Sequence, residues 1–316
     1  MNLEGTTEFG RSLLGGTGQV FVKTKFGTSS VLAPQVYQQA QLPFGFKVVT
    51  NIRFKSAPTD PPPLHEYEFF RDAEPWDVPS CFEGHKILEG LCLSPTQARA
   101  LERDTRQQAK SPRWHKERAL RLTASNFGVA ATREVWSQKG LHNLTSTRDL
   151  SKVPAIRHGI TQEPIAVQRY MDVLQSLGHS ATVGSCGIFV DPSTPWLGAS
   201  PDRIVFDPTE VPPHGVLEVK CPKTLYDKSV EELKTLKFCS EIKGDCPELR
   251  RTHDYYHQVL GQMAIAGLQW GDFVVFGDQF ILVERIRFCP DDWSAVSMEL
   301  QDFYFDQLLP HLELLH

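Results

Sequence analysis

The stretch Gly215-Val-Leu-Glu-Val-Lys-Cys-Pro222 has the composition of a short buried strand that ends at a proline, which cannot continue a hydrogen-bonded ladder. Glu218 and Lys220 interrupt its apolar residues. Because side chains alternate along a strand, these two charges share one face, while Leu217 and Val219 share the other. Burying a charge is costly unless it is paired or holds a metal. The stretch therefore predicts either an ordinary Glu–Lys pair on an exposed face or a buried functional pair.

The segment from Ala199 to Phe206, which precedes this strand in the sequence, supplies a second carboxylate, Asp202. The residues between the two segments contain Asp-Pro and Pro-Pro turn signals, so a hairpin or meander would bring Asp202 beside Glu218. Two carboxylates and the Val219 carbonyl suit a hard cation such as Mg²⁺, which prefers oxygen ligands and keeps several waters. Lys220 would then orient such a water or help to deprotonate it.

These residues resemble the core motif of the PD-(D/E)XK nucleases: Ser200-Pro-Asp202 followed by Glu218-Val-Lys220. More narrowly, the chain is similar to the phage lambda exonuclease and YqaJ-like viral recombinase family. Further pieces of that pattern follow in the right order. They are Trp114-His-Lys-Glu-Arg118 with Leu122-Thr-Ala-Ser125, then Gly159 to Glu163, and Tyr256 to Gln262. The resemblance covers the chain from about residue 94 to residue 310.

The resemblance implies a catalytic set of five residues: Asp202, Glu218, Lys220, Glu163 and Gln258. Asp202 and Glu218 would hold Mg²⁺, for which Mn²⁺ could substitute, together with the Val219 carbonyl. Glu163 would support the metal directly or through a water. Lys220 would position the attacking water and stabilise the developing charge. Gln258 would hold the metal-binding groups in place.

It also assigns four residues to phosphate and DNA: Arg118, Ser125, Ser200 and Tyr255. An arginine fork matches phosphate oxygens, and a serine hydroxyl at the start of a helix adds a donor where anions are favoured. The simpler interpretation of Ser125 is an ordinary N-cap. Tyr255, Gln258 and Gln262 recur at helical spacing, so they form one polar stripe on a helix predicted at 252–267.

The composition sets limits on the class of protein. The chain has 316 residues, 41% of them hydrophobic, and a formal net charge of −5, so it is not a bulk polyanion binder. The segment 99–121 nevertheless carries eight Lys or Arg against three acids, a local +5 that leaves −10 elsewhere. A basic segment in an otherwise acidic protein is typical of a protein that binds phosphate at one place. A solvent-exposed helix face would have the same composition.

The resemblance implies an α/β fold with a restriction-endonuclease-like mixed central sheet flanked by helices. We expect residues 1–90 to form a partly irregular N-terminal extension and residues 91–316 the nuclease domain. Ser94 and Gln97 predict a capping box at the start of one helix. Residues 133–155 have the composition of loops. Thr161-Gln-Glu-Pro164 predicts a helix start that places Glu163 in the first turn, where the helix dipole favours a carboxylate.

The seven cysteines have no framework spacing, which indicates a reducing compartment, and we expect no iron–sulfur cluster. The first residues do not resemble a signal peptide, and no apolar run approaches the about 18 residues of a membrane span. We therefore expect no membrane partner and an intracellular location, cytoplasmic or nuclear.

The sequence thus predicts a magnesium-dependent DNA nuclease. The resemblance implies an exonuclease that recognises a 5′ phosphate on duplex DNA and acts in recombination or repair. It further implies a ring-like homo-trimer and a single-strand annealing protein as partner. Four alternatives stay open at this point. They are an exonuclease with another polarity, a structure-specific endonuclease, a catalytically silent DNA-binding or scaffold module with a nuclease fold, and an enzyme that acts on another phosphodiester such as RNA.

Overall fold

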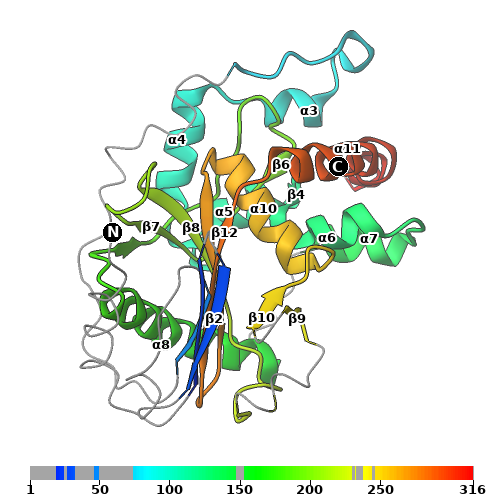
Figure 1. Cartoon of the computed structure of the whole chain (residues 1–316). Coiled ribbons are helices and arrows are strands. Elements are labelled where there is room, and N and C mark those ends of the chain that lie inside the picture. Colours follow the sequence, from blue (N-terminus) through cyan, green and yellow to red (C-terminus); the bar gives the residue numbers. More distant parts are fainter. Residues whose placement is uncertain are drawn as a thin grey trace.

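The computed structural model of the chain (Figure 1) describes residues 19–24, 27–32, 46–49, 74–146, 153–229, 232, 238–243 and 246–315. The helices are α3 (Lys86–Leu91), α4 (Pro95–Asp104), α5 (Pro112–Ala119), α6 (Phe127–Thr132), α7 (Gln138–Thr145), α8 (Pro154–Ser176), α10 (Asp254–Ala266), α11 (Pro290–Phe303) and α12 (Leu309–Glu313). The strands are β1 (Gln19–Thr24), β2 (Gly27–Leu32), β3 (Phe46–Val49), β4 (Leu122–Thr123), β5 (Thr182–Gly184), β6 (Leu197–Gly198), β7 (Arg203–Phe206), β8 (His214–Lys220), β9 (Ser240–Lys243), β10 (Cys246–Leu249), β11 (Trp270–Phe276) and β12 (Ile281–Arg287).

A six-stranded mixed sheet with the order β3-β12-β11-β8-β7-β5 forms the centre of the fold. The predicted strand, β8, lies inside this sheet, parallel to β11 and antiparallel to β7. All of its residues except Lys220 are buried, as expected of a strand covered on both faces. β11 and β12 pair as an antiparallel hairpin. The mixed α/β fold with helices around a central sheet is confirmed.

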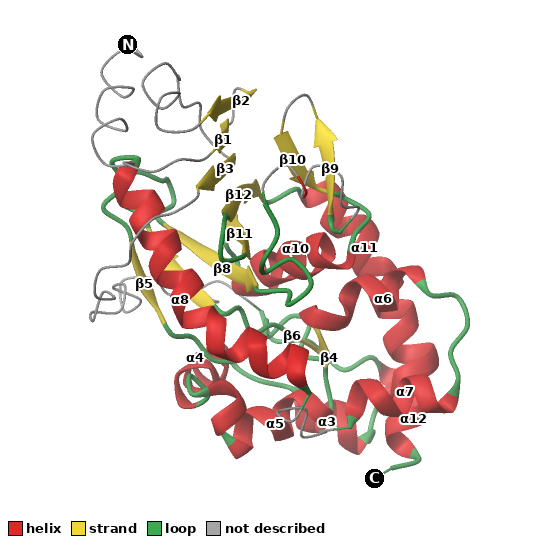
Figure 2. Cartoon of the chain, turned by 90° about the horizontal axis from the view of Figure 1, so that it is seen from below, coloured by secondary structure: helices red, strands yellow, loops and turns green. Residues whose placement is uncertain are grey.

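Helices cover both faces of the sheet: α8 lies on one side, while α10, α6 and α11 lie on the other (Figures 1 and 2). Leu217 and Val219 of β8 belong to the same apolar cluster as Tyr170 of α8. Val216 belongs to the other cluster, with Val259 of α10. The alternation of β8 therefore directs Glu218 and Lys220 toward α10, which confirms the predicted division of the strand into an apolar face and a charged face.

Helix α8 differs from the prediction because it begins at Pro154 rather than Thr161. Pro164 lies inside the helix, and Glu163 lies well beyond the first turn, so the helix dipole does not account for Glu163. An interior proline removes one backbone hydrogen bond, but the C-terminal half of α8 is anchored by its buried apolar residues. The segment 133–155 is also less loop-rich than predicted, since it contains α7.

Part of the expected N-terminal extension joins the sheet, because β3 pairs antiparallel with β12. β1 and β2 form a separate antiparallel pair. The domain boundary near residue 90 stays a prediction. Among the residues that the structure describes, no helix is both long and apolar enough to span a bilayer.

Gly187 lies where α4 packs closely against the chain that leads to β7. A Cβ at this position would meet the Glu102 carbonyl oxygen at 1.9 Å and the Thr105 hydroxyl at 2.3 Å. We expect Gly187→Ala to lower the free energy of unfolding by about 1–3 kcal/mol, the usual cost of overpacking, as measured by urea denaturation. Gly90→Ala is the matched control, because a Cβ there meets nothing within 4 Å. Equal stability of the two variants would contradict this account of the packing.

Candidate active site

Asp202, at the start of β7, lies beside the end of β8. The antiparallel register sets Arg203 opposite Leu217, so Asp202 reaches the end of β8 where Glu218 and Val219 lie. The Asp202 Oδ2 atom accepts a hydrogen bond from the Val219 backbone N–H at 2.7 Å. The hairpin predicted from the turn signals therefore brings the two carboxylates together, as the sequence analysis expects.

Glu218 is buried, and three side chains hold its carboxylate. Oε1 accepts hydrogen bonds from Lys220 Nζ at 2.6 Å and from Gln258 Nε2 at 2.7 Å. Oε2 accepts one from Gln262 Nε2 at 2.7 Å. Gln258 and Gln262 are one turn apart on α10, so they approach the carboxylate from the same helix face. Gln262 is absent from the predicted catalytic set, although the i, i+4 spacing from Gln258 is the signal that identifies it.

Lys220 lies between its carboxylate partners and an aromatic ring. Its Nζ also donates to Gln258 Oε1 at 3.1 Å and lies 4.7 Å from the centre of the Tyr255 ring. Burial lowers the pKa of Lys220, but Glu218 and Asp202 outweigh this effect and raise the pKa above its usual value. Lys220 is therefore a cation at neutral pH, which favours charge stabilisation and water positioning over proton abstraction.

The surroundings of Asp202 disfavour its charged form, whereas those of Lys220 favour the charged form. Burial raises its pKa well above the usual value, and the neighbouring carboxylates Glu218 and Glu163 raise it further, against the smaller effects of Lys220 and the Val219 N–H. Glu163 reaches this region from α8 and forms an ion pair with Arg203 at 2.9 Å. Lys220 pairs with Glu218 and Arg203 pairs with Glu163, so the Asp202 carboxylate is the one of the three that has no ion pair in these contacts, and an additional cation would stabilise its charged form.

The donor set fits a magnesium ion. Asp202, Glu218 and the Val219 carbonyl offer oxygen atoms only, and Mg²⁺ is commonly held by one or two carboxylates while it keeps several waters. No group of three or more His, Cys, Asp or Glu in the described part of the chain is arranged to hold a metal ion. Asp202 and Glu218 would therefore be the two carboxylate ligands, and waters would fill the remaining positions.

Three of the four residues assigned to phosphate and DNA are brought together, and Trp114 links them, whereas Tyr255 lies beside Lys220. The Arg118 guanidinium stacks on the Trp114 ring at 4.3 Å, and its Nη2 lies 3.4 Å from the Ser125 hydroxyl. The Trp114 indole N–H donates to the Ser200 hydroxyl at 2.9 Å. Burial lowers the pKa of Arg118 to about 10, with Glu218 opposing the shift, so the guanidinium stays charged at neutral pH.

Ser125 is exposed and lies within the short helical turn Ala124–Asn126, so it is not the N-cap of α6, whose cap position is Asn126. Its hydroxyl is available beside Arg118. Trp114 belongs to the quoted motif but not to the predicted site residues. Only the folded structure reveals that its ring and its N–H join two of them.

The three acids of the basic strip at 99–121 pair with some of its arginines, but the strip keeps its local net charge of +5. Arg121 is buried and bonded to Glu117 and to the carbonyls of Pro195 and Leu91, which makes it a structural residue. Arg106 forms a two-pronged pair with the buried Glu102. The strip is therefore not one continuous phosphate-binding face, and Arg118 is the arginine that it contributes to the site.

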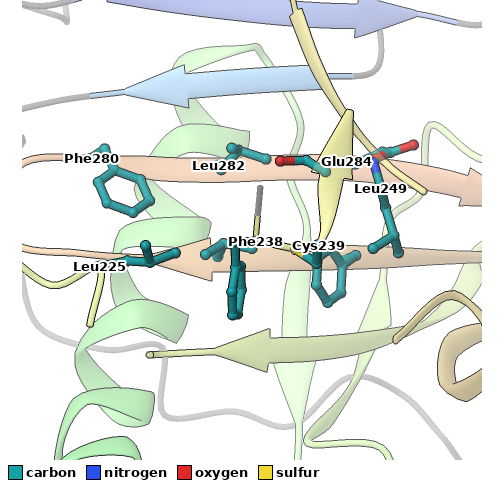
Figure 3. Close-up of a pocket in the computed structure, with 10 residues that line it drawn as sticks. Leu225, Phe238, Cys239, Leu249, Phe280, Leu282 and Glu284 are labelled. Atoms are coloured by element: carbon teal, nitrogen blue, oxygen red, sulfur yellow. The ribbon is translucent and has the colours of Figure 1, made fainter. Parts of the chain in front are cut away.

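A small, mostly apolar pocket lies beside β11 and β12 (Figure 3). Its lining includes Phe238 and Phe273, whose rings also contact the Tyr255 ring. The cavity measures only 20 Å³, about the space that one water molecule requires. This pocket is therefore too small to accommodate a nucleobase.

Comparisons with known proteins place these observations in context. The profile of the YqaJ-like viral recombinase domain matches residues 113–269. An alkaline exonuclease from Laribacter hongkongensis is 26% identical over 65% of this chain and 96% of its own, with a TM-score of 0.47. The shutoff and exonuclease protein of Kaposi's sarcoma-associated herpesvirus is 14% identical over 72% of this chain and 74% of its own, with a TM-score of 0.42. A phage-related exonuclease from Haemophilus somnus is 12% identical over 61% of this chain and 96% of its own, with a TM-score of 0.39. No curated protein sequence matches the chain.

Proposed function

Because this chain belongs to the YqaJ-like viral recombinase family of PD-(D/E)XK nucleases, we propose that it is a magnesium-dependent DNA nuclease. The observation that carries the proposal is the convergence of Asp202, Glu218 and Lys220 at the adjoining ends of β7 and β8. Burying several charged side chains together costs free energy unless they are paired or bind a ligand, so such a cluster is not expected in a module without catalytic activity. The same cluster is what hydrolysis of a phosphodiester requires.

In the proposed mechanism, Asp202, Glu218 and the Val219 carbonyl hold the divalent cation, and Glu163 supports them. When bound, the cation supplies Lewis-acid activation and lowers the pKa of a coordinated water. Gln258 and Gln262 fix both oxygens of Glu218, so this ligand is oriented before the substrate arrives. Lys220 donates a hydrogen bond to the attacking water and stabilises the negative charge that develops on the phosphoryl oxygens.

Arg118, Ser125 and Ser200 form the proposed binding site for the terminal 5′ phosphate, and Tyr255 lines the same space beside Lys220. The charged Arg118 fork matches phosphate oxygens, and the two hydroxyls add donors around it. Binding of a terminal phosphate at this place would orient the end of a DNA strand relative to the catalytic carboxylates. This arrangement supports an exonuclease that starts at a 5′ end, with a role in DNA recombination.

The proposal is tested by incubating the protein and Mg²⁺ with linear duplex DNA, with and without a 5′ phosphate, and with closed circular DNA. We expect degradation of the linear DNA only, faster with the 5′ phosphate. Nicking of the circle would favour a structure-specific endonuclease, and binding without cleavage would favour the silent module. A single-stranded RNA substrate distinguishes a preference for RNA.

Sedimentation of the protein alone tests the homo-trimer that the family implies. Sedimentation after addition of a single-strand annealing protein tests whether the two proteins bind each other.

Arg118→Ala should reduce the preference for a 5′ phosphate. A hydrogen bond to a charged group contributes about 1.5–3 kcal/mol, so the ratio of kcat/KM for phosphorylated over hydroxyl ends should fall by about tenfold to a hundredfold. Arg113→Ala is the control, because Arg113 is an exposed arginine on the same helix that pairs with Asp104. An unchanged ratio in Arg118→Ala would contradict the assignment of the phosphate site.

A further inference from the structure

The C-terminal end of α4 and the turn after it hold the chain that leads into Asp202. The buried Glu102 accepts a hydrogen bond from the Gly187 N–H, and the Thr105 hydroxyl accepts one from the Ile188 N–H, both at 2.9 Å. Gln108 makes the third connection. These contacts join segments that are about 80 residues apart in the sequence, and none of these three side chains lies within the matched domain at 113–269.

The Gln108 amide bridges two backbone carbonyls. Its Nε2 donates to the Cys186 oxygen at 3.0 Å and to the Pro201 oxygen at 2.8 Å. The Pro201 carbonyl is part of the peptide bond to Asp202, so its direction fixes the plane from which the Asp202 side chain projects. Both donors of one amide are therefore engaged in fixing the backbone immediately before a catalytic carboxylate.

The backbone of Gln108 has an unusual conformation for this residue type. Its φ is +44°, and it is the one non-glycine residue with positive φ in the described part of the chain. The left-handed region costs an ordinary residue about 1–2 kcal/mol, whereas glycine adopts it freely. Such conformations persist where the surroundings determine them, and they gather at functional sites. A glycine here would remove the strain, but it would also remove the bridging amide.

We propose that Gln108 is a positioning residue that holds the Pro201–Asp202 peptide so that the Asp202 carboxylate is directed toward the divalent cation. This inference rests on the proposed function, in which Asp202 binds that cation. Gln108 acts through the backbone and does not contact the cation itself. Partners of this kind commonly change metal affinity or activity by about 10- to 100-fold when they are removed.

The test uses the full chain with Gln108→Gly and Gln108→Leu, and Gln107→Leu as control. Gln107 is the exposed neighbour on the same turn. Mn²⁺ binding to the metal-free protein is measured by electron paramagnetic resonance, together with the melting temperature, the Mg²⁺ concentration for half-maximal cleavage and the KM for DNA. We expect both Gln108 variants to bind Mn²⁺ about tenfold more weakly and to require about tenfold more Mg²⁺, with KM for DNA unchanged.

The two substitutions separate positioning from folding. Gln108→Gly relieves the positive φ, which offsets part of the stability lost with the two hydrogen bonds, so it should melt at a higher temperature than Gln108→Leu while it loses metal affinity to the same extent. Wild-type Mn²⁺ affinity and Mg²⁺ requirement in Gln108→Gly would overturn the inference and leave Gln108 a structural residue. If the wild-type chain itself neither binds Mn²⁺ nor cleaves DNA, the proposed function fails, and this inference fails with it.

Discussion

Asp202→Asn should abolish cleavage of linear duplex DNA while it leaves the fold intact. The cation that Asp202 is proposed to hold contributes several kcal/mol to the transition state, so we expect kcat to fall by about a thousandfold or more. The amide keeps the size of the carboxylate, and its oxygen still accepts the hydrogen bond that the Val219 N–H donates. Single-turnover cleavage and DNA affinity, measured separately, distinguish loss of chemistry from loss of binding.

The same substitution should stabilise the protein when no metal is present. Burial, Glu218 and Glu163 raise the pKa of Asp202 in the folded state, so its ionised form destabilises the fold at neutral pH. Asp202→Asn should therefore raise the melting temperature in chelator at pH 7. The gain should shrink as the pH falls and disappear below about pH 4, where the carboxyl is protonated in both states. A lower melting temperature at pH 7, or full cleavage activity, would contradict the role given to Asp202.

Lys220→Met is the second substitution with a large expected effect. Methionine keeps the length and much of the volume of the side chain but removes the positive charge and the hydrogen-bond donors. Loss of one preorganised donor at a developing charge commonly lowers kcat by about a hundredfold to a thousandfold. We expect a decrease of that size in single-turnover cleavage, with DNA affinity largely retained because Lys220 acts on the reacting phosphate.

Stability must be measured beside activity in this variant, because Lys220 also pairs with the buried Glu218. Gln258 and Gln262 still donate to Glu218 after the substitution, so we expect a lower melting temperature but a folded protein. Lys223→Met is the control, since Lys223 is exposed and lies just beyond the end of β8. Cleavage by Lys220→Met at a rate near that of Lys223→Met would refute the catalytic assignment.

Local patterns in the sequence determined several features correctly. The Ser94 hydroxyl and the Gln97 amide form the predicted capping box at the start of α4, because all partners of that motif lie within four residues. The alternation in β8 predicted which face carries Glu218 and Lys220. A local signal also failed: the segment from Thr161 to Pro164, interpreted as a helix start, lies inside α8 because the helix already begins at Pro154.

The sequence by itself thus determined which strand carries Glu218 and Lys220. It also determined that the turns after Asp202 bring this residue next to Glu218, and that the groups available to bind a cation are oxygen atoms. The tertiary structure alone decided which distant side chains complete the site. Trp114 reaches Ser200 across 86 residues, Gln108 reaches Pro201 across 93, and Arg121 is buried against Pro195 rather than exposed to phosphate. The physical reason is that hydrogen bonds along a strand or helix follow its period, whereas contacts between elements depend on how their faces pack together.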